Sequence, residues 1–184
     1  MILLLVAAMW VAEILDHLLP VEADYWGIDP RTAGGLIGIA ISPFLHGDFG
    51  HLLSNTIPFI LLGLLVAWRA GPMTWRVLVV ITLVGGFGVW LLSPANVITI
   101  GASGVVFGLM GYLLAAGVIV RRAIDILLAV GVLLLYGGML LGATPVGASA
   151  GVSWLAHFTG LVAGVLAATL YAPRSQPARP TVDA

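Results

Sequence analysis

A serine and two histidines stand at or near the starts of three separate apolar runs of this chain. They are Ser103, His51 and His157. A serine hydroxyl is a weak nucleophile until a base removes its proton, and histidine is the usual base. Strongly polar side chains are costly inside apolar spans, so their presence there marks a functional site by default. The residue types therefore favour nucleophilic catalysis, with Ser103 as the attacking group.

Acyl transfer also needs hydrogen-bond donors for the negative charge that develops on the substrate oxygen. His51 and Asn55 are four residues apart, so their side-chain N–H groups lie on one face of a helix. The backbone N–H of Ser103 is a further donor at a helix N-terminus, where partial positive charge gathers. We predict that these three groups stabilise an oxyanion.

Carboxylates are missing from the three runs that carry these residues. In many soluble hydrolases a carboxylate orients the catalytic histidine. Glu13 and Asp16 lie in the first apolar run, and depth alone does not exclude them as partners of the histidine; we interpret them as the polar end of that run near the outer headgroups. Asp125 lies toward the other side, and we interpret it as a cytoplasmic boundary. We therefore expect a dyad of Ser103 and His157 rather than a triad.

The elements that must position these residues are membrane helices. Of the 184 residues, 61% are hydrophobic and 8% are charged, whereas a soluble domain carries about 25% charged residues. Each of the six apolar runs is near the roughly 17–25 residues that a helix needs to cross the hydrocarbon core. The sequence predicts an all-α membrane protein, a polytopic bundle of six transmembrane helices. The runs cover residues 2–19, 50–68, 76–93, 103–120, 123–142 and 153–171.

Arginine predicts the orientation, because cytoplasmic loops are enriched in basic residues. The chain has no lysine, and Arg31 alone among its arginines lies on the side opposite to the others. We therefore place both termini in the cytoplasm and the first loop, about residues 20–49, outside. The cytoplasmic arginines are Arg69, Arg76, Arg121, Arg122, Arg174 and Arg179.

One domain boundary follows from composition. Residues 1–172 form the predicted membrane domain, and the Pro-rich, polar residues 173–184 form a short disordered cytoplasmic tail. The first ten residues lack a basic segment and a cleavage site, so we expect a retained first span rather than a secretory signal. We expect a multi-pass integral membrane protein of a prokaryotic plasma membrane.

Ser103, His51 and His157 fall at one depth in this topology. Each precedes the next cytoplasmic arginine of its own segment by 17 or 18 residues. At about 1.5 Å per residue, each lies roughly 26 Å from the cytoplasmic arginine level. That height is inside a core of about 30 Å and close to its outer boundary.

Small residues predict which of these helices touch. Two stripes of glycine and alanine recur at helical spacing, one in the fourth run and one in the sixth. Such stripes let helix backbones approach closely in lipid. We expect the stripes to face each other, so that Ser103 and His157 meet at the outer end of the contact. The stripes are Gly104, Gly108, Gly111 and Ala115, and Ala156, Gly160, Gly164 and Ala168.

These segments resemble the motifs of the rhomboid intramembrane serine proteases. The similar stretches are GASG opening the fourth run, HLLSN opening the second and AHFTGLVAG in the sixth. The resemblance covers about residues 46–171. It implies that Ser103 is the nucleophile and His157 the general base, with His51, Asn55 and the Ser103 amide at the oxyanion.

The resemblance also assigns residues around the dyad. Gly101 matches the first glycine of the serine motif, and His46 matches an outer histidine before the second span, which is either solvated or functional. Phe107 stands where the family often has tyrosine, and we expect its ring to stack on His157. Many members carry a Trp-Arg pair in the first loop, which this chain lacks, so the sequence leaves the anchoring of that loop open.

The predicted function is that of an intramembrane endopeptidase, which cleaves transmembrane segments of substrate proteins near the outer side of the membrane. We predict no cofactor and no metal, since no His-Glu-x-x-His cluster occurs. A net charge of −1 gives no support for nucleic-acid binding. The alternatives are a rhomboid-like pseudoprotease, disfavoured by the intact Ser103 and His157, and a small channel or transporter, disfavoured by the lack of repeats. The sequence does not give the oligomeric state.

Overall fold

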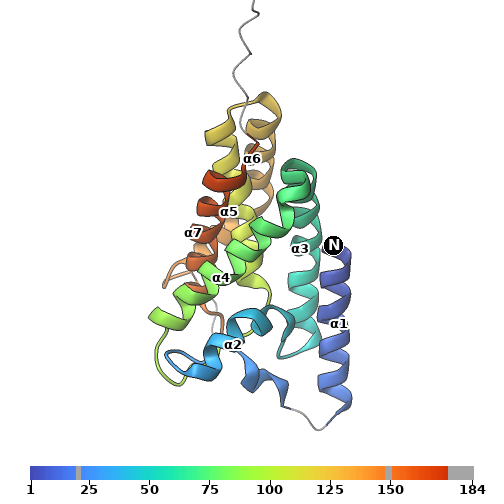
Figure 1. The fold of residues 1–184 in the computed structure, drawn as a ribbon, viewed down its shortest axis with the longest axis vertical. Helices are drawn as coiled ribbons and strands as arrows, with labels where there is room; N and C mark the ends of the chain where they lie inside the picture. Colours follow the sequence, from blue (N-terminus) through green and yellow to red (C-terminus); the bar gives the residue numbers. More distant parts are fainter. Residues whose placement is uncertain (20–21, 148–150, 174–184) are drawn as a thin grey trace, which may run out of the picture.

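The computed structural model describes residues 1–19, 22–147 and 151–173. These residues form helices, and no strand is named among them. The all-α class predicted from the sequence is therefore confirmed. The tail predicted at 173–184 lies outside the described residues from position 174 onward. The helices are α1 Ile2–Leu18, α2 Ala33–Ile41, α3 Phe49–Ala70, α4 Thr74–Leu92, α5 Ser103–Val120, α6 Ala123–Tyr136 and α7 Trp154–Tyr171 (Figure 1).

Short 3₁₀ segments connect several of these helices. They are η1 Ala23–Trp26, η2 Ser42–Phe44, η3 Gly71–Met73 and η4 Gly137–Ala143. All six apolar runs expected from the sequence are helical. Within the described residues, four helical stretches are long and apolar enough to cross a membrane, and the first of them contains both α3 and α4. These stretches are Phe49–Leu92, Ser103–Val120, Ala123–Ala143 and Trp154–Tyr171.

The first loop contains structure that the sequence analysis did not predict. Helix α2 begins where the Thr32 hydroxyl accepts a hydrogen bond from the Gly35 N–H at 3.0 Å. The loop is anchored to the end of α4, because Arg31 Nη1 donates to the carbonyls of Leu91 at 3.1 Å and Ser93 at 2.6 Å. Trp90 returns a hydrogen bond from its indole N–H to the Thr32 carbonyl at 2.8 Å. These bonds anchor the first loop, although the chain lacks the Trp-Arg pair that many family members carry there.

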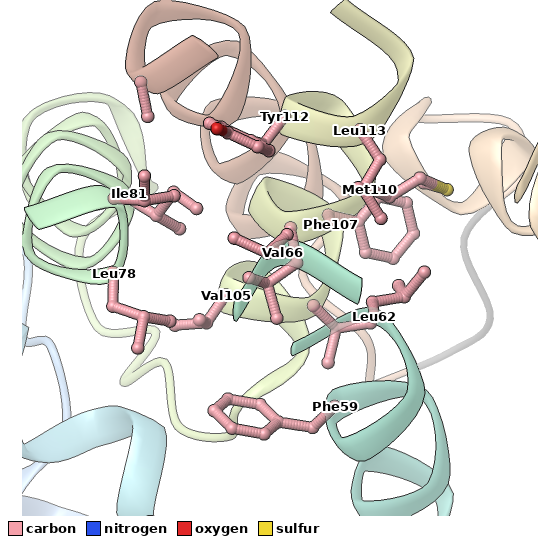
Figure 2. Close-up of a cluster of buried hydrophobic side chains, with 14 of the residues drawn as sticks. Phe59, Leu62, Val66, Leu78, Ile81, Val105, Phe107, Met110, Tyr112 and Leu113 are labelled. Carbon is pink, nitrogen blue, oxygen red and sulfur yellow. The ribbon is translucent and has the colours of Figure 1, made fainter. Parts of the chain in front are cut away.

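Helix α5 lies at the centre of the bundle and packs against α3, α4, α6 and α7. Its apolar side chains fill the space between α3 and α4, so that the first turn of α5 sits on a packed core. Figure 2 shows this core, with side chains from all three helices directed toward one another. The labelled residues are Phe59, Leu62, Val66, Leu78, Ile81, Val105, Phe107, Met110, Tyr112 and Leu113.

Helices α5 and α7 make the closest contact in the described structure. A Cβ added at Gly160 would overlap the carbonyl of Gly104, and one added at Gly164 would overlap the carbonyl of Gly108. The backbones therefore touch directly, as the facing small-residue stripes predict. This contact fixes the separation of the two helices that begin near Ser103 and His157.

Helix α6 is packed much less tightly. Of its residues 123–136, all of which are described, Asp125 and Val132 are the buried ones. Leu134 and Leu135 are 80% and 81% exposed in the isolated chain. Near its start α6 is held to α3 by an ion pair, in which Arg69 Nε and Nη2 donate to the two Asp125 carboxylate oxygens at 2.8 Å each.

Candidate active site

Ser103 is the first residue of α5, and the turn before it depends on glycine. Gly101 has a φ of 104°, which an L side chain rarely adopts. A Cβ there would also lie 2.8 Å from Cε1 of His51. Position 101 must therefore be glycine both for its backbone angle and for the space that the His51 ring occupies.

Two of the three amides that lead into α5 already have acceptors. The Gly101 N–H donates to the Ser42 carbonyl at 2.9 Å, and the Ala102 N–H donates to His46 Nε2 at 3.4 Å. The Ser103 N–H has no acceptor among the described residues. As the first residue of a helix, it has no intrahelical partner either. This amide is thus available to an anionic oxygen beside the serine.

The Ser103 hydroxyl and the His157 imidazole are in hydrogen-bond contact. The distance from Oγ to Nε2 is 2.9 Å. The other ring nitrogen, Nδ1, lies 3.0 Å from the carbonyl oxygen of Gly142. A carbonyl only accepts, so Nδ1 carries the ring proton and Nε2 is the acceptor for the serine hydroxyl. In this tautomer Nε2 can take the serine proton.

The Phe107 ring lies flat on the His157 imidazole. The ring centroids are 4.0 Å apart and the planes differ by 7°. Phe107 is fully buried one turn after Ser103, so the stacking expected from the sequence is present. The contact sets the plane of the imidazole without offering it a hydrogen bond.

His51 lies beside the same turn, and Asn55 follows it one helical turn later in α3. The Asn55 side chain is buried, and its Nδ2 donates to the His51 carbonyl at 3.0 Å. An amide NH₂ has two donors, so one N–H is left over. The His51 ring lies against Gly101, because a Cβ on that glycine would be 2.9 Å from His51 Nε2. The His51 ring is therefore next to the Gly101–Ser103 turn, and Asn55 is bound to the His51 backbone one turn further along α3.

His46 is buried, with 1% of its surface exposed, so the solvated alternative is wrong. Its Nε2 accepts from Ala102, which places the proton on Nδ1, an atom with no partner among the described residues. Burial, together with the neighbouring His51, lowers the pKa of His46 to about 4. His46 is thus a neutral acceptor that holds the turn before Ser103.

A hollow of about 780 Å³ lies next to the site. Residues 97–100, which precede the serine turn, form one wall, and residues 151–155, which precede His157, form another. The first wall is held by an antiparallel pair between Ile28 and Thr99, with hydrogen bonds of 2.9 and 3.0 Å. The hollow is therefore bordered by both chain segments that lead into the dyad.

The carboxylates of the first helix do not contact the dyad in the described structure. Glu13 is buried in the protein, and its place near the outer headgroups stays a prediction. Asp16 accepts a hydrogen bond from the Ala23 N–H at 2.9 Å. Among the described residues no group of three or more His, Cys, Asp or Glu side chains is arranged to hold a metal.

Sequence reasoning missed two polar contacts. The Gly142 carbonyl at His157 comes from the backbone of a glycine-rich stretch, which carries no signal in its side chains. The partners Arg69 and Asp125 were both noted, but as separate markers of the membrane boundary. Their pairing was predictable in principle, since a carboxylate buried among apolar helices requires a cationic partner.

Comparison with known proteins gives a match to one protein family and several similar sequences. Residues 33–174 match the family profile of the Rhomboid domain. An uncharacterized protein of Mycobacterium tuberculosis is 40% identical over 185 residues, which is 97% of this chain and 77% of the relative. An uncharacterized protein of Mycobacterium leprae is 38% identical over 177 residues, 92% of this chain and 69% of the relative. RHOMBOID-like protein 5 of Arabidopsis thaliana is 38% identical over 74 residues, 39% of this chain and 24% of that protein.

Proposed function

Because this chain belongs to the rhomboid family, an intramembrane protease family, we propose that it is a serine endopeptidase which cleaves transmembrane segments of substrate proteins. The observation that carries the proposal is the 2.9 Å contact between Ser103 Oγ and His157 Nε2. It joins a nucleophile to a base in the tautomer that can accept its proton.

The reaction follows the general course of acyl transfer. Ser103 Oγ attacks the scissile carbonyl while His157 Nε2 takes its proton, and His157 then gives that proton to the leaving amine. A water molecule activated by the same imidazole hydrolyses the acyl-enzyme. The Ser103 N–H, the His51 ring and the second N–H of Asn55 are the proposed donors to the oxyanion. No cofactor or metal enters this scheme.

Six helices, α1, α3, α4, α5, α6 and α7, each cross the membrane in the proposed topology. In this topology the chain reverses at η3, and the long apolar stretch Phe49–Leu92 supplies two spans, α3 and α4. The arginine distribution places both termini in the cytoplasm. Residues 1–172 form the membrane domain, residues 173–184 the cytoplasmic tail, and the dyad faces the outer side.

A substrate segment must leave its helical form to reach the dyad, because a helix hides its carbonyls in its own hydrogen bonds. The hollow beside residues 97–100 and 151–155 has room for such an extended segment. Substrates with helix-breaking residues near their outer ends are therefore favoured. We propose that cleavage occurs there and that the protein is a multi-pass protein of the plasma membrane.

The test is cleavage of a transmembrane peptide in lipid vesicles that contain the purified protein. The peptide carries a helix-breaking pair near one end and a fluorophore on each side of it. The wild-type protein is expected to cut the peptide, whereas Ser103→Ala, His157→Ala and the double variant lose cleavage to the same extent, since the two residues act as a unit. Binding of the peptide without cleavage by the wild-type protein would instead indicate a pseudoprotease.

A further inference from the structure

The His157 imidazole has two polar contacts, and the second comes from a part of the chain outside the sequence motifs. Nε2 meets Ser103, and Nδ1 donates to the Gly142 carbonyl at 3.0 Å. Gly142 belongs to η4, the 3₁₀ segment Gly137–Ala143 that continues α6. A backbone carbonyl thus stands where soluble Ser-His-Asp hydrolases place a carboxylate.

We propose that the Gly142 carbonyl is the positioning group of the catalytic base, a third member of the site made from backbone. This inference rests on the proposed proteolytic function and deepens it. The carbonyl selects the tautomer with the proton on Nδ1, leaves Nε2 free for the serine proton, and stabilises the imidazolium that forms during the reaction.

Stacking on Phe107 cannot select the orientation and the tautomer of the His157 ring. A half-turn of the imidazole about its Cβ–Cγ bond keeps the ring on Phe107 but puts carbon atoms where the two nitrogens were. Stacking is also indifferent to which nitrogen carries the proton. The acceptor at Nδ1 distinguishes both the ring orientation and the tautomer. In a soluble Ser-His-Asp protease, the wrong tautomer alone costs about 10⁴ in turnover.

The end of η4 explains why this carbonyl is available. The last carbonyls of a helix have no partner within it. The Leu141 carbonyl is taken by Thr144, whose N–H donates at 3.0 Å and whose hydroxyl donates at 2.7 Å. The next carbonyl, that of Gly142, is left for His157. A neutral acceptor avoids burying a carboxylate at membrane depth, which is costly.

Glycine at position 142 allows the carbonyl to approach the ring edge. A Cβ there would lie 3.4 Å from His157 Nδ1 and 3.7 Å from Phe107 Cζ. The additional methyl groups of valine would extend into this contact and displace the carbonyl. At Gly138, in the same segment, a Cβ meets nothing within 4 Å. The two glycines provide a matched pair of test positions.

The experiment is ¹⁵N NMR of histidine-labelled protein in detergent at a pH where the imidazoles are neutral. The chain has four histidines, and the spectrum of His157→Gln identifies the signals of His157. We expect the wild-type His157 to carry its proton on Nδ1. We expect Gly142→Val to show a mixture of tautomers and to lower kcat by tenfold or more with little change in KM. Gly138→Val should keep both the spectrum and the rate.

The wild-type spectrum decides the inference even if Gly142→Val does not fold. A proton on Nε2 of His157 in the wild-type protein would overturn it, and so would a Gly142→Val protein with unchanged tautomer and rate. A different outcome is a wild-type protein that carries the Nδ1 proton but neither cleaves the peptide nor reacts with a serine-directed fluorophosphonate. That result would overturn the proposed protease function. The two failures are therefore distinguishable.

Discussion

Helices α5 and α7 touch backbone to backbone, whereas α6 meets its neighbours with few buried side chains. In the first region the carbonyls of Gly104 and Gly108 occupy the space that side chains at Gly160 and Gly164 would need. In the second region the carboxylate of Asp125 is one of two buried side chains of the helix. Both regions nevertheless contribute to one hydrogen-bonded site.

The difference separates two tasks. The rigid contact sets the distance between Ser103 and His157, the proposed nucleophile and base, because Ser103 begins α5 and His157 lies in the first turn of α7. The loosely packed α6 and η4 contribute one backbone carbonyl, which sets the proton position on the base. A displacement of α6 can therefore change the tautomer of His157 without changing the position of Ser103 on α5.

The largest effect is expected from a methyl group in the rigid contact. In Gly164→Ala the new Cβ overlaps the Gly108 carbonyl, a backbone atom that cannot move aside. We expect a loss of about 3 kcal/mol or more in the free energy of unfolding, the upper end for overpacking. Gly131→Ala in α6, where a Cβ meets nothing within 4 Å, should be neutral or stabilising. Thermal unfolding in detergent measures both, and equal effects would contradict the comparison.

The ion pair of α6 gives the next effect. Arg69→Met leaves the buried Asp125 carboxylate without its two hydrogen bonds. Removing one partner of a buried pair costs about 3 kcal/mol or more. The double variant Arg69→Met, Asp125→Leu should recover most of the loss, since no unpaired charge is left behind. A double-mutant cycle by chemical unfolding checks this, and strictly additive losses would show that the pair does not hold α6.

The dependence of stability on pH tests the role of His46, which holds the turn before Ser103. The pKa of His46 is about 4 in the folded chain against an ordinary value of 6.5. The unfolded chain therefore binds more protons between these values, and stability falls as pH falls from 6.5 to 4. The total is about 3 kcal/mol at 1.36 kcal/mol per pKa unit. His51 and Asp48 also face this group.

The control for that prediction is a pair of substitutions. His46→Gln should flatten the pH dependence of the unfolding temperature between pH 6.5 and 4, because the neutral amide keeps an acceptor but takes up no proton. His17→Gln, which changes an exposed histidine of α1, should leave the dependence as it is. If the unfolding temperature of His46→Gln depends on pH as steeply as that of the wild type, His46 is not the source of the dependence.

The smallest effect concerns the Phe107 ring, which stacks on His157 within the first region. Phe107 on α5 stacks on His157 of α7 at 4.0 Å between centroids, and such contacts are worth about 0.5–1.5 kcal/mol. Phe107→Ala should lower turnover roughly tenfold, the factor that about 1.4 kcal/mol gives. Phe107→Tyr keeps the ring and should be tolerated. Steady-state cleavage rates of both variants test this prediction. Full activity in Phe107→Ala would show that the ring does not position His157.

Much of this architecture could be predicted from the sequence, because lipid permits few solutions. The apolar runs predicted the helices, and the small-residue stripes predicted the contact of α5 with α7. The side chains of Ser103, His157 and Phe107 lie together as their spacing indicates. In each case the prediction rests on side chains: long apolar runs, small residues at helical spacing, or polar residues at equal depth.

The rest depends on backbone and on loops, for which composition carries no signal. Helix α2 is only nine residues long and contains three glycines, so its sequence falls short of a membrane span and is predicted as part of the first loop. The Gly142 carbonyl belongs to the backbone, so no side-chain type in the sequence predicts it. The bond from Arg31 to the end of α4 depends on a backbone path through the first loop that no periodic pattern encodes.

The most direct test of the central claim is covalent labelling of the purified protein by a fluorophosphonate, followed by mass spectrometry. The reagent reacts with an activated serine hydroxyl and needs no knowledge of the substrate. We predict a single label on Ser103 in the wild-type protein, and no label in Ser103→Ala or His157→Ala, although both variants stay folded. An unlabelled wild-type protein, a label on another serine, or full labelling of His157→Ala would contradict the assignment of Ser103 and His157 as nucleophile and base.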